Sequence, residues 1–375
     1  MSGHTDLVVI FGAGSIGRGL LGERVAAAHW RTIFVEADEA LRCLLAGSTS
    51  YRVRLVGRDP TKRNVSDFEV LGPSDAEALK NALARCRFAA TAVGGQNLQA
   101  IAPFLVEGLD RRNDPLNILL CENWPRPEET LGHALNEAGA APETYRLVPS
   151  SVERMVRRGE DLELTGESSE TVIIDRSSWH GPIPPIEGLI FVDEVEPYYK
   201  RKLYTNNAGQ VVLAYLGHLR GSRLLIEALA QRDIAEDLNT FLQIASRVLE
   251  REYFLRRAHL DEHIMNLLEH RFSNKELADT IERVARQPIR KLGPGERLIG
   301  LLRLAEKYEL DTNPICKVTA AALHYFDPED DQCREMRGMI EVGGPGQVLL
   351  EVCKLRRDEI HYERCLEYYE SLKWR

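Results

Sequence analysis

A lysine followed by three side-chain amides is the segment of this sequence best suited to chemistry. Lys202 precedes Asn206, Asn207 and Gln210, and an apolar run after them predicts a helix. Partial burial beside Arg201 would disfavour the lysine ammonium, so the amine could act as a base toward an alcohol or as an acid toward a ketone. The amide N–H groups could stabilise an oxyanion. The spacing alone equally fits a helix start with a surface lysine and capping asparagines.

Three glycines lie between a strand-like run and a helix-like run near the start of the chain. Gly12, Gly14 and Gly17 follow the apolar residues 7–11 and precede residues 18–30, whose pattern predicts a helix. Glycines at this spacing permit a tight turn, a close approach of backbone to a pyrophosphate and close packing of the helix. The segment therefore predicts a dinucleotide-binding turn. The alternative is that the glycines serve only to connect a strand to a helix.

A carboxylate after the second predicted strand indicates which dinucleotide would bind. Glu36 follows the strand-like residues 32–35 and lies nineteen residues past Gly17. A carboxylate at this point can accept hydrogen bonds from both ribose hydroxyls of NAD and would repel the 2′-phosphate of NADP. Asp38 and Glu39 follow closely and could share or take this role. The predicted cofactor is NAD.

Two further predicted strands end beside chemically useful residues. Residues 88–93 run into Gly94, and residues 116–121 are followed by Asn123. Ligands of open parallel sheets bind outside the carboxyl ends of the strands, so we expect these ends to lie beside the glycine turn. The residues predicted to bind the cofactor are Gly12, Gly14, Ser15, Ile16, Gly17, Glu36, Thr91, Val93, Gly94 and Asn123.

The alternation of strand-like and helix-like segments predicts an α/β fold with two domains. Residues 1–195 are expected to form an NAD-binding domain with a Rossmann-type, doubly wound parallel sheet. Residues 51–71 alternate apolar and charged side chains, which suggests an antiparallel excursion from that sheet. Helical periodicity dominates residues 196–375, which are expected to form a mostly helical substrate and catalytic domain.

Composition limits the other possibilities. At 375 residues, 44% hydrophobic and 28% charged, the chain is typical of a globular protein large enough for two domains. Its net charge of −9 argues against nucleic acid as the main partner, but it does not exclude an anionic small-molecule substrate, because local basic clusters can override the overall charge. The seven cysteines are scattered without metal-ligand spacing, which predicts reduced thiols and no metal site. No leader or membrane span is predicted, so we expect a cytoplasmic protein, either a monomer or a homodimer.

Several motifs in one order over most of the chain resemble a known family. The chain is similar to the polyol-specific long-chain dehydrogenase/reductase family, although the match is thin across residues 51–85, 130–145 and beyond 331. The motifs that carry the resemblance are Phe11–Gly19, Thr91–Gly94, Pro115–Asn123, Ser151–Arg154, Arg201–Gly209, Glu282–Leu292 and Ala320–His324.

The resemblance implies a metal-independent, NAD-dependent oxidoreductase. Within that family the chain is most similar to members that interconvert mannitol 1-phosphate and fructose 6-phosphate. The resemblance also implies an active site in the cleft between two domains. By motif, Lys202 is similar to the catalytic acid/base, Asn207 and Asn123 to the two arms of the oxyanion site, and Glu36 to the residue that selects NAD. The residues expected at the substrate are Glu153, Arg154, Asn206 and His324. A lone histidine such as His324 on an apolar helix face also fits a hydrogen-bonded core residue.

The chain departs from the family pattern at three positions near these motifs. Gln210 stands where relatives carry a histidine, Asn206 replaces an apolar residue, and Trp124 follows Asn123 where relatives are less bulky. On an ideal α-helix Asn206 would point nearer to Lys202 than Asn207 does. Three alternatives therefore stay open: a detuned enzyme, a dehydrogenase of another polyol, a uronate or a cyclitol, or a non-catalytic NAD(H)-binding protein.

One cluster of cations is a candidate receptor for a substrate phosphate. Arg286, Arg290 and Lys291 lie within six residues around a proline. Arginine and lysine clusters suit phosphate recognition. The same cations could instead decorate the C-terminus of a helix and interact with its dipole.

Overall fold

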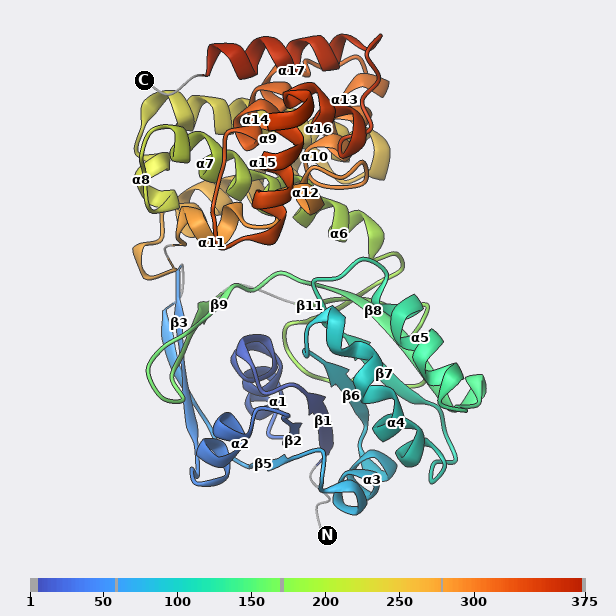
Figure 1. Cartoon of the computed structure of the whole chain (residues 1–375). Helices are drawn as coiled ribbons and strands as arrows, with labels where there is room; N and C mark the ends of the chain where they lie inside the picture. Colours follow the sequence, from blue (N-terminus) through green and yellow to red (C-terminus); the bar gives the residue numbers. More distant parts are fainter. Residues whose placement is uncertain (1–5, 58–59, 169–171, 278, 373–375) are drawn as a thin grey trace. The chain divides into compact units, whose positions relative to one another are not determined.

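The chain folds into two compact units, Met1–Tyr198 and Tyr199–Arg375 (Figure 1). The structure is a computed structural model, and it describes residues 6–57, 60–168, 172–277 and 279–372. The predicted boundary near residue 195 lies just before helix α6 (Glu196–Arg201), within which the two units meet along the chain.

The first unit contains an eight-stranded sheet of order β12-β11-β8-β7-β6-β1-β2-β5. The six neighbouring strands β8, β7, β6, β1, β2 and β5 pair in parallel. Strand β11 is antiparallel to β8, and β12 is parallel to β11. The order from β5 to β8 is that of a dinucleotide-binding sheet, which confirms the predicted Rossmann-type fold. The strands are β1 (Leu7–Phe11), β2 (Arg31–Val35), β5 (Phe68–Leu71), β6 (Phe88–Thr91), β7 (Leu116–Leu120), β8 (Tyr145–Val152), β11 (Val172–Asp175) and β12 (Leu189–Val192).

Alternate side chains of the central strands enter two separate cores. In β1, Val9 and Phe11 pack with one core, whereas Val8 and Ile10 pack with the other. Helices α3, α4 and α5 cover the first of these faces (Figure 1). Because both faces are covered, β1 is apolar throughout instead of alternating with polar residues. These three helices are α3 (Ala76–Arg85), α4 (Leu98–Leu109) and α5 (Pro127–Glu137), and α2 (Glu39–Ala46) belongs to the same unit.

A second sheet of four strands packs against the first helix. Its order is β4-β3-β10-β9, and it contains β3 (Tyr51–Val56), β4 (Thr61–Val65), β9 (Val156–Arg158) and β10 (Leu164–Glu167). The antiparallel pairing of β3 with β4 confirms the predicted excursion over that stretch. The prediction is wrong for the last strand of residues 51–71, because β5 pairs in parallel with β2 and extends the main sheet.

The first helix is helical as predicted, but its first turn is wound differently. Residues Gly17–Gly22 form a π-helical segment (η1) that continues into α1 (Glu23–Ala27). A Cβ on Gly19 would lie 2.5 Å from Val156 Cγ1, and a Cβ on Gly22 would lie 2.4 Å from the Tyr51 hydroxyl. The missing side chains therefore let the second sheet approach the helix backbone closely.

The second unit is helical, as the periodicity predicts. Helix α7 (Ala208–Leu219) is buried over nearly its whole length and packs against α9, α11 and α14, which explains its almost entirely apolar sequence. No helix within the described ranges is long and apolar enough to cross a membrane. The other helices used below are α9 (Arg232–Tyr253), α10 (Arg257–Asn266), α11 (Ile281–Ala285), α12 (Pro288–Lys291), α13 (Ile299–Lys307), α14 (Asn313–Leu323) and α17 (Ile360–Ser371).

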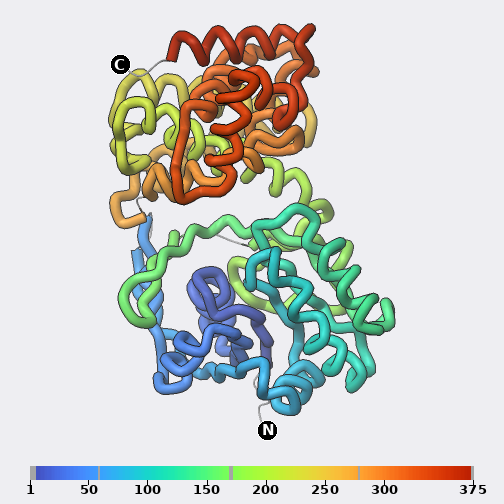
Figure 2. Tube along the Cα trace, in the orientation of Figure 1, coloured from blue at the N-terminus to red at the C-terminus, as the bar shows by residue number. Residues whose placement is uncertain are grey.

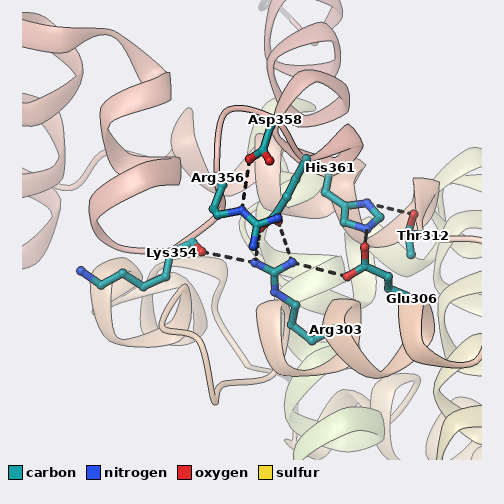
Figure 3. Close-up of polar contacts among 8 residues, drawn as sticks. Arg303, Glu306, Thr312, Lys354, Arg356, Asp358 and His361 are labelled. Carbon is teal, nitrogen blue, oxygen red and sulfur yellow. Dashed lines mark hydrogen bonds and ion pairs between the residues drawn. The ribbon is translucent and has the colours of Figure 1, made fainter.

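Polar contacts join the last helix to the body of the second unit. The Arg303 guanidinium on α13 makes a two-pronged contact with Glu359, at 2.6 and 3.1 Å, just before α17 begins. His361 on α17 lies 3.1 Å from Glu306 Oε1 and 3.3 Å from the Thr312 hydroxyl (Figure 3). Hydrogen bonding to Cys316 and the nearby charge of Glu306 raise the pKa of His361. These contacts hold α17 in one orientation on α13 and α14.

Candidate active site

The glycine turn has the backbone geometry that its spacing predicts. Gly12 has a φ of +91°, and a Cβ there would lie 2.4 Å from the Ala92 carbonyl oxygen. A Cβ on Gly17 would lie 1.9 Å from the Gly12 carbonyl oxygen. Neither position can carry a side chain without moving the backbone. Gly14 is less enclosed, since the nearest atom to its Cβ position is Arg158 Nη2 at 3.2 Å.

Glu36 lies directly at this turn, whereas the two acidic residues after it are engaged elsewhere. Its Oε2 accepts a hydrogen bond from the Ala13 backbone N–H at 2.7 Å, and its Oε1 accepts one from the Asp38 N–H at 2.9 Å. The Asp38 side chain caps α2 by accepting from the Leu41 N–H, and Glu39 pairs with Arg42. Of the three candidates, Glu36 is the carboxylate that contacts the glycine turn.

A cavity of about 380 Å³ opens at the carboxyl ends of β1 and β6. It brings together the predicted residues Gly12, Gly14, Glu36 and Val93, and its size falls within the range of small-molecule sites. The backbone of Gly14 and the carboxylate of Glu36 suit the pyrophosphate and ribose of NAD. Its other lining residues are Phe11, Val35, Ala37, Pro73, Ala92, Asn97, Ala100, Ile101, Phe104 and Arg158.

A carboxylate that the sequence analysis missed closes the turn after β6. Glu122 accepts hydrogen bonds from the backbone N–H groups of Val93, at 3.0 Å, and of Gly94, at 2.9 Å. Burial raises the pKa of this carboxyl group. The position of Glu122 next to Asn123 was the only sequence signal that could have drawn attention to it.

The residues after Glu122 differ in how far they are engaged. The Trp124 ring packs on the backbone of Gly95, where a Cβ would lie 2.1 Å from Trp124 Cγ. The contact with Gly95 accounts for the position of this bulky ring without a ligand. The exposed Asn123 side chain forms no hydrogen bond with any residue that the structure describes.

Lys202 begins a π-helical segment, which changes the expected geometry of the amides. The segment η4 (Lys202–Asn207) connects α6 to α7. A π turn joins residue i to residue i+5, so it brings Asn207 nearer to the face of Lys202 than an α-helix does. The expectation that Asn206 points nearer to Lys202 assumed an ideal α-helix, and which of the two amides faces Lys202 stays a prediction. Asn206 is buried, and its Oδ1 has no hydrogen-bond partner among the described residues.

A histidine from α10 supports this π turn and was also missed by the sequence analysis. The Thr205 hydroxyl donates to the Arg201 carbonyl oxygen at 2.6 Å and lies 2.9 Å from His263 Nε2. Because the hydroxyl proton is already used, Nε2–H of His263 must be the donor to Thr205. Burial, followed by the charges of Arg201 and Arg271, holds the pKa of His263 well below its usual value. A neutral imidazole thus joins α10 to the segment that begins at Lys202.

Gln210 is turned toward an acidic residue. Its Nε2 donates to Asp279 Oδ2 at 3.3 Å, and Asp279 also accepts from Arg283 Nε at 2.6 Å. The position where relatives carry a histidine is therefore next to a carboxylate. A catalytic role for Gln210 stays a prediction.

The three predicted phosphate-binding cations differ in how they are held. Lys291 Nζ donates to the carbonyl oxygens of Val284, at 2.5 Å, and of Arg286. Burial, and then the charges of Arg297, Arg290 and Arg286, lower the pKa of Lys291 to about 6. Lys291 thus binds the last carbonyls of α11, and a contact with phosphate stays a prediction for it.

The two arginines of this cluster are more exposed to solvent than Lys291. Arg290 donates from Nε to Gln287 Oε1 at 3.0 Å and lies 3.7 Å from Glu296, with about 38% of its side chain exposed. Arg286 donates from Nε to the Arg283 carbonyl oxygen at 3.3 Å and is exposed. Their outer N–H groups can therefore reach an anion in solution.

Three residues predicted at the substrate are engaged inside their own units. Arg154 forms a fully buried ion pair with Glu23 at 2.8 Å, and Glu153 accepts from the Ser151 hydroxyl at 3.0 Å. His324 stacks on Tyr369 with ring centroids 4.1 Å apart, and its Nε2 lies 2.9 Å from the Tyr369 carbonyl oxygen. These contacts give each residue a structural role, and their contact with a substrate stays a prediction.

Comparison with known proteins gives consistent matches in both units. Residues 6–155 match the family model of the mannitol dehydrogenase Rossmann domain, and residues 194–341 match that of the mannitol dehydrogenase C-terminal domain. The mannitol-1-phosphate 5-dehydrogenase of Pseudarthrobacter chlorophenolicus is 32% identical over 363 residues, which cover 93% of each chain.

Two solved structures share the fold over 98% of this chain and 92% of their own, each at 18% sequence identity. One is the mannitol 2-dehydrogenase of Pseudomonas fluorescens in a ternary complex with NAD and D-mannitol, with a TM-score of 0.78. The other is a D-sorbitol dehydrogenase in substrate-free form, with a TM-score of 0.81.

Proposed function

Because the chain belongs to the mannitol dehydrogenase family and is an NAD-dependent polyol dehydrogenase, we propose that it interconverts mannitol 1-phosphate and fructose 6-phosphate without a metal ion. The observation that carries this proposal is the 32% identity, over nearly the whole chain, with a mannitol-1-phosphate 5-dehydrogenase. When bound, NAD supplies the hydride acceptor for the alcohol or, as NADH, the hydride donor for the ketone.

The proposal assigns proton transfer to Lys202. Its amine would take the proton of the substrate hydroxyl in one direction and return it to the carbonyl oxygen in the other. Asn207 and Asn123 would donate side-chain N–H groups to the same oxygen as negative charge develops on it. The π turn at Lys202–Asn207 and the amide of Asn123, which no described residue engages, support these roles.

The buried amide of Asn206 has a supporting role in this proposal. Its Oδ1 lacks a partner among the described residues, and a buried acceptor of this kind is costly unless something donates to it. A substrate hydroxyl would satisfy it. In the relatives an apolar residue takes this position, so Asn206 would be a contact particular to this chain.

The glycine turn and Glu36 would hold the cofactor. The cavity at β1 and β6 contains a glycine backbone for the pyrophosphate and a carboxylate for the ribose hydroxyls. Of the other predicted cofactor residues, Thr91 is buried at the end of β6, Ser15 and Ile16 are helical residues directly after Gly14, and Gly94 has a φ of +85°.

The proposed receptor for the substrate phosphate is the arginine pair Arg286 and Arg290. Guanidinium groups bind phosphate through two parallel hydrogen bonds. We expect Arg290→Gln to raise the KM for fructose 6-phosphate by about 10- to 100-fold, the loss of one or two charge-assisted hydrogen bonds. Any residual activity on free fructose, measured in parallel at high sugar concentration, should change little. An equal fractional loss with both sugars would show that Arg290 does not bind phosphate.

A second candidate is the oxidation of another polyol, a uronate or a cyclitol by the same catalytic groups. The observation that favours it is Gln210, whose amide is bound to Asp279 at a position where relatives have an imidazole. A screen of such substrates with NAD would separate the two candidates. Faster turnover of a non-phosphorylated substrate would favour the second.

A further inference from the structure

An arginine from the second sheet lies against the glycine turn. Arg158 is the last residue of β9, and it lines the cavity that also contains Gly14 and Glu36. Its Nη2 is the closest atom to the Cβ position of Gly14, at 3.2 Å. In a dinucleotide-binding turn the second glycine is the one whose bare backbone lets a pyrophosphate approach. A planar cation therefore lies beside the point where that group is expected.

The position of this arginine is set by packing on both sides of it. Val156, two residues earlier on β9, packs so tightly on Gly19 that a Cβ there would lie 2.5 Å from Val156 Cγ1. Side chains two residues apart share one face of a strand, so Arg158 lies on the face of Val156, whereas Arg157 lies on the other. Figure 2 shows this part of the chain, in green, beside the dark blue first helix.

A buried arginine joins the same two segments by hydrogen bonds. Arg18 Nε donates to the Ala13 carbonyl oxygen at 2.7 Å, within the glycine turn. Its Nη1 donates to the Leu162 carbonyl oxygen at 3.1 Å, in the connection between β9 and β10. The connection that follows Arg158 is thus held over the turn independently of any ligand.

The guanidinium of Arg158 is available to an anion. It forms no hydrogen bond or ion pair with any residue within the described ranges, and it is exposed. Glu36 is the acidic residue of the cavity, and both of its oxygens accept from backbone N–H groups. The charge of Arg158 also contributes, after burial, to the lowered pKa of Arg18. A cation without an ion-pair partner in the described part of the chain, beside a bare glycine backbone, is suited to a phosphate group.

We infer that Arg158 binds the pyrophosphate of NAD beside Gly14 of the glycine turn. The arginine fork matches phosphate oxygens in two parallel hydrogen bonds. The 2′-phosphate of NADP is the other phosphate that could reach such a cation. The carboxylate of Glu36 at the ribose position opposes that second anion. This inference rests on NAD as the cofactor and is independent of which polyol reacts.

The test measures ligand binding without substrate, so that a wrong substrate assignment leaves it intact. Binding of NADH and of NADPH is followed by their fluorescence, and adenosine and ADP are titrated as competitors against the full chain. We expect Arg158→Gln to weaken NADH and ADP binding by about 10- to 100-fold and adenosine binding by less than about twofold. Arg158→Lys should fall between, because lysine keeps the charge without the fork.

Arg157→Gln is the matched control, because it removes the same charge from the other face of the same strand. It should bind NADH as the wild type does, and circular dichroism should confirm that both variants are folded. Unchanged NADH and ADP affinity in Arg158→Gln would overturn the inference. So would an equal loss for adenosine, which would indicate a role in cavity shape, or a loss confined to NADPH, which would indicate the 2′-phosphate.

Discussion

Lys202 and the amides around it are the residues on which the proposed chemistry depends. The structure places Lys202 and Asn207 at the two ends of one π turn and leaves Asn123 unengaged by other described residues. Single π turns inside α-helices occur often at functional sites, because they re-aim one side chain without ending the helix. The neutral His263 contacts the Thr205 hydroxyl within the same turn and so stabilises it.

Replacing the lysine should separate catalysis from cofactor binding. We expect Lys202→Met to lower kcat for fructose 6-phosphate reduction by about 10²- to 10⁴-fold, the usual contribution of a general acid or base. NADH affinity, measured by fluorescence, should stay unchanged. Lys200→Met, two residues earlier on the same helix, is the control and should keep wild-type turnover. Turnover close to wild type in Lys202→Met would remove it from the proposed mechanism.

Replacing Gln210 by the histidine of the relatives tests whether Gln210 only lowers activity on fructose 6-phosphate or indicates a different substrate. In Gln210→His the imidazole would lie next to Asp279, which could orient it and stabilise its charged form. We expect kcat/KM for fructose 6-phosphate to rise by about tenfold if the chain is a detuned enzyme for this substrate. Adding Asp279→Asn should cancel the gain. A loss of activity in Gln210→His would instead favour a different substrate.

At the scale of elements, the sequence predicted the strands and turns that depend on neighbouring residues of the chain. The runs at residues 7–11 and 32–35 became β1 and β2, and the glycine spacing produced the expected turn. The π turns at η1 and η4 could not be predicted, because they depend on tertiary contacts such as those of Gly19 and Thr205. The approach of Arg158 to Gly14 is equally non-local, and nothing in the sequence near either residue signals it.

The engagement of Lys291 was missed for the same reason, and it has a consequence for stability. The pKa of Lys291 is lowered to about 6, so between pH 6 and the ordinary lysine pKa of about 10.4 the unfolded chain binds a proton that the folded chain does not. The contribution of Lys291 to the free energy of unfolding therefore rises with pH in this window.

Comparison with a variant isolates this contribution. Lys291→Met should unfold more easily than wild type at alkaline pH, where the neutral amine of Lys291 donates to the carbonyls of Val284 and Arg286 and the variant has no donor. The gap, which is the free energy of unfolding of the wild type minus that of Lys291→Met, should increase from pH 6.5 to 8.5 by up to about 1.4 kcal/mol per pH unit. Urea unfolding followed by circular dichroism measures it, with the exposed Lys354→Met as control. A gap that is constant or narrows with pH would contradict a lowered pKa.

At the scale of the whole molecule, the chain consists of two compact units, each with its own core. The glycine turn, Glu36 and Arg158 belong to the first, and Lys202, Asn207 and the Arg290 cluster belong to the second. NADH alone should therefore protect one unit. Hydrogen exchange read by mass spectrometry should slow at residues 12–17 and 93–95 on NADH addition. Exchange in α13 and α17 should not change, and equal protection of both units would contradict this assignment.

The most direct test of the central proposal is NADH consumption by the purified wild-type protein with fructose 6-phosphate, with free fructose in parallel. We predict turnover with the phosphorylated ketose and little or none with the free sugar, also in the presence of a metal chelator. Absence of turnover with fructose 6-phosphate, in a preparation shown to bind NADH, would contradict the proposed reaction. Other carbonyl substrates would then have to be tested, with Gln210 as the first residue to examine for substrate selection.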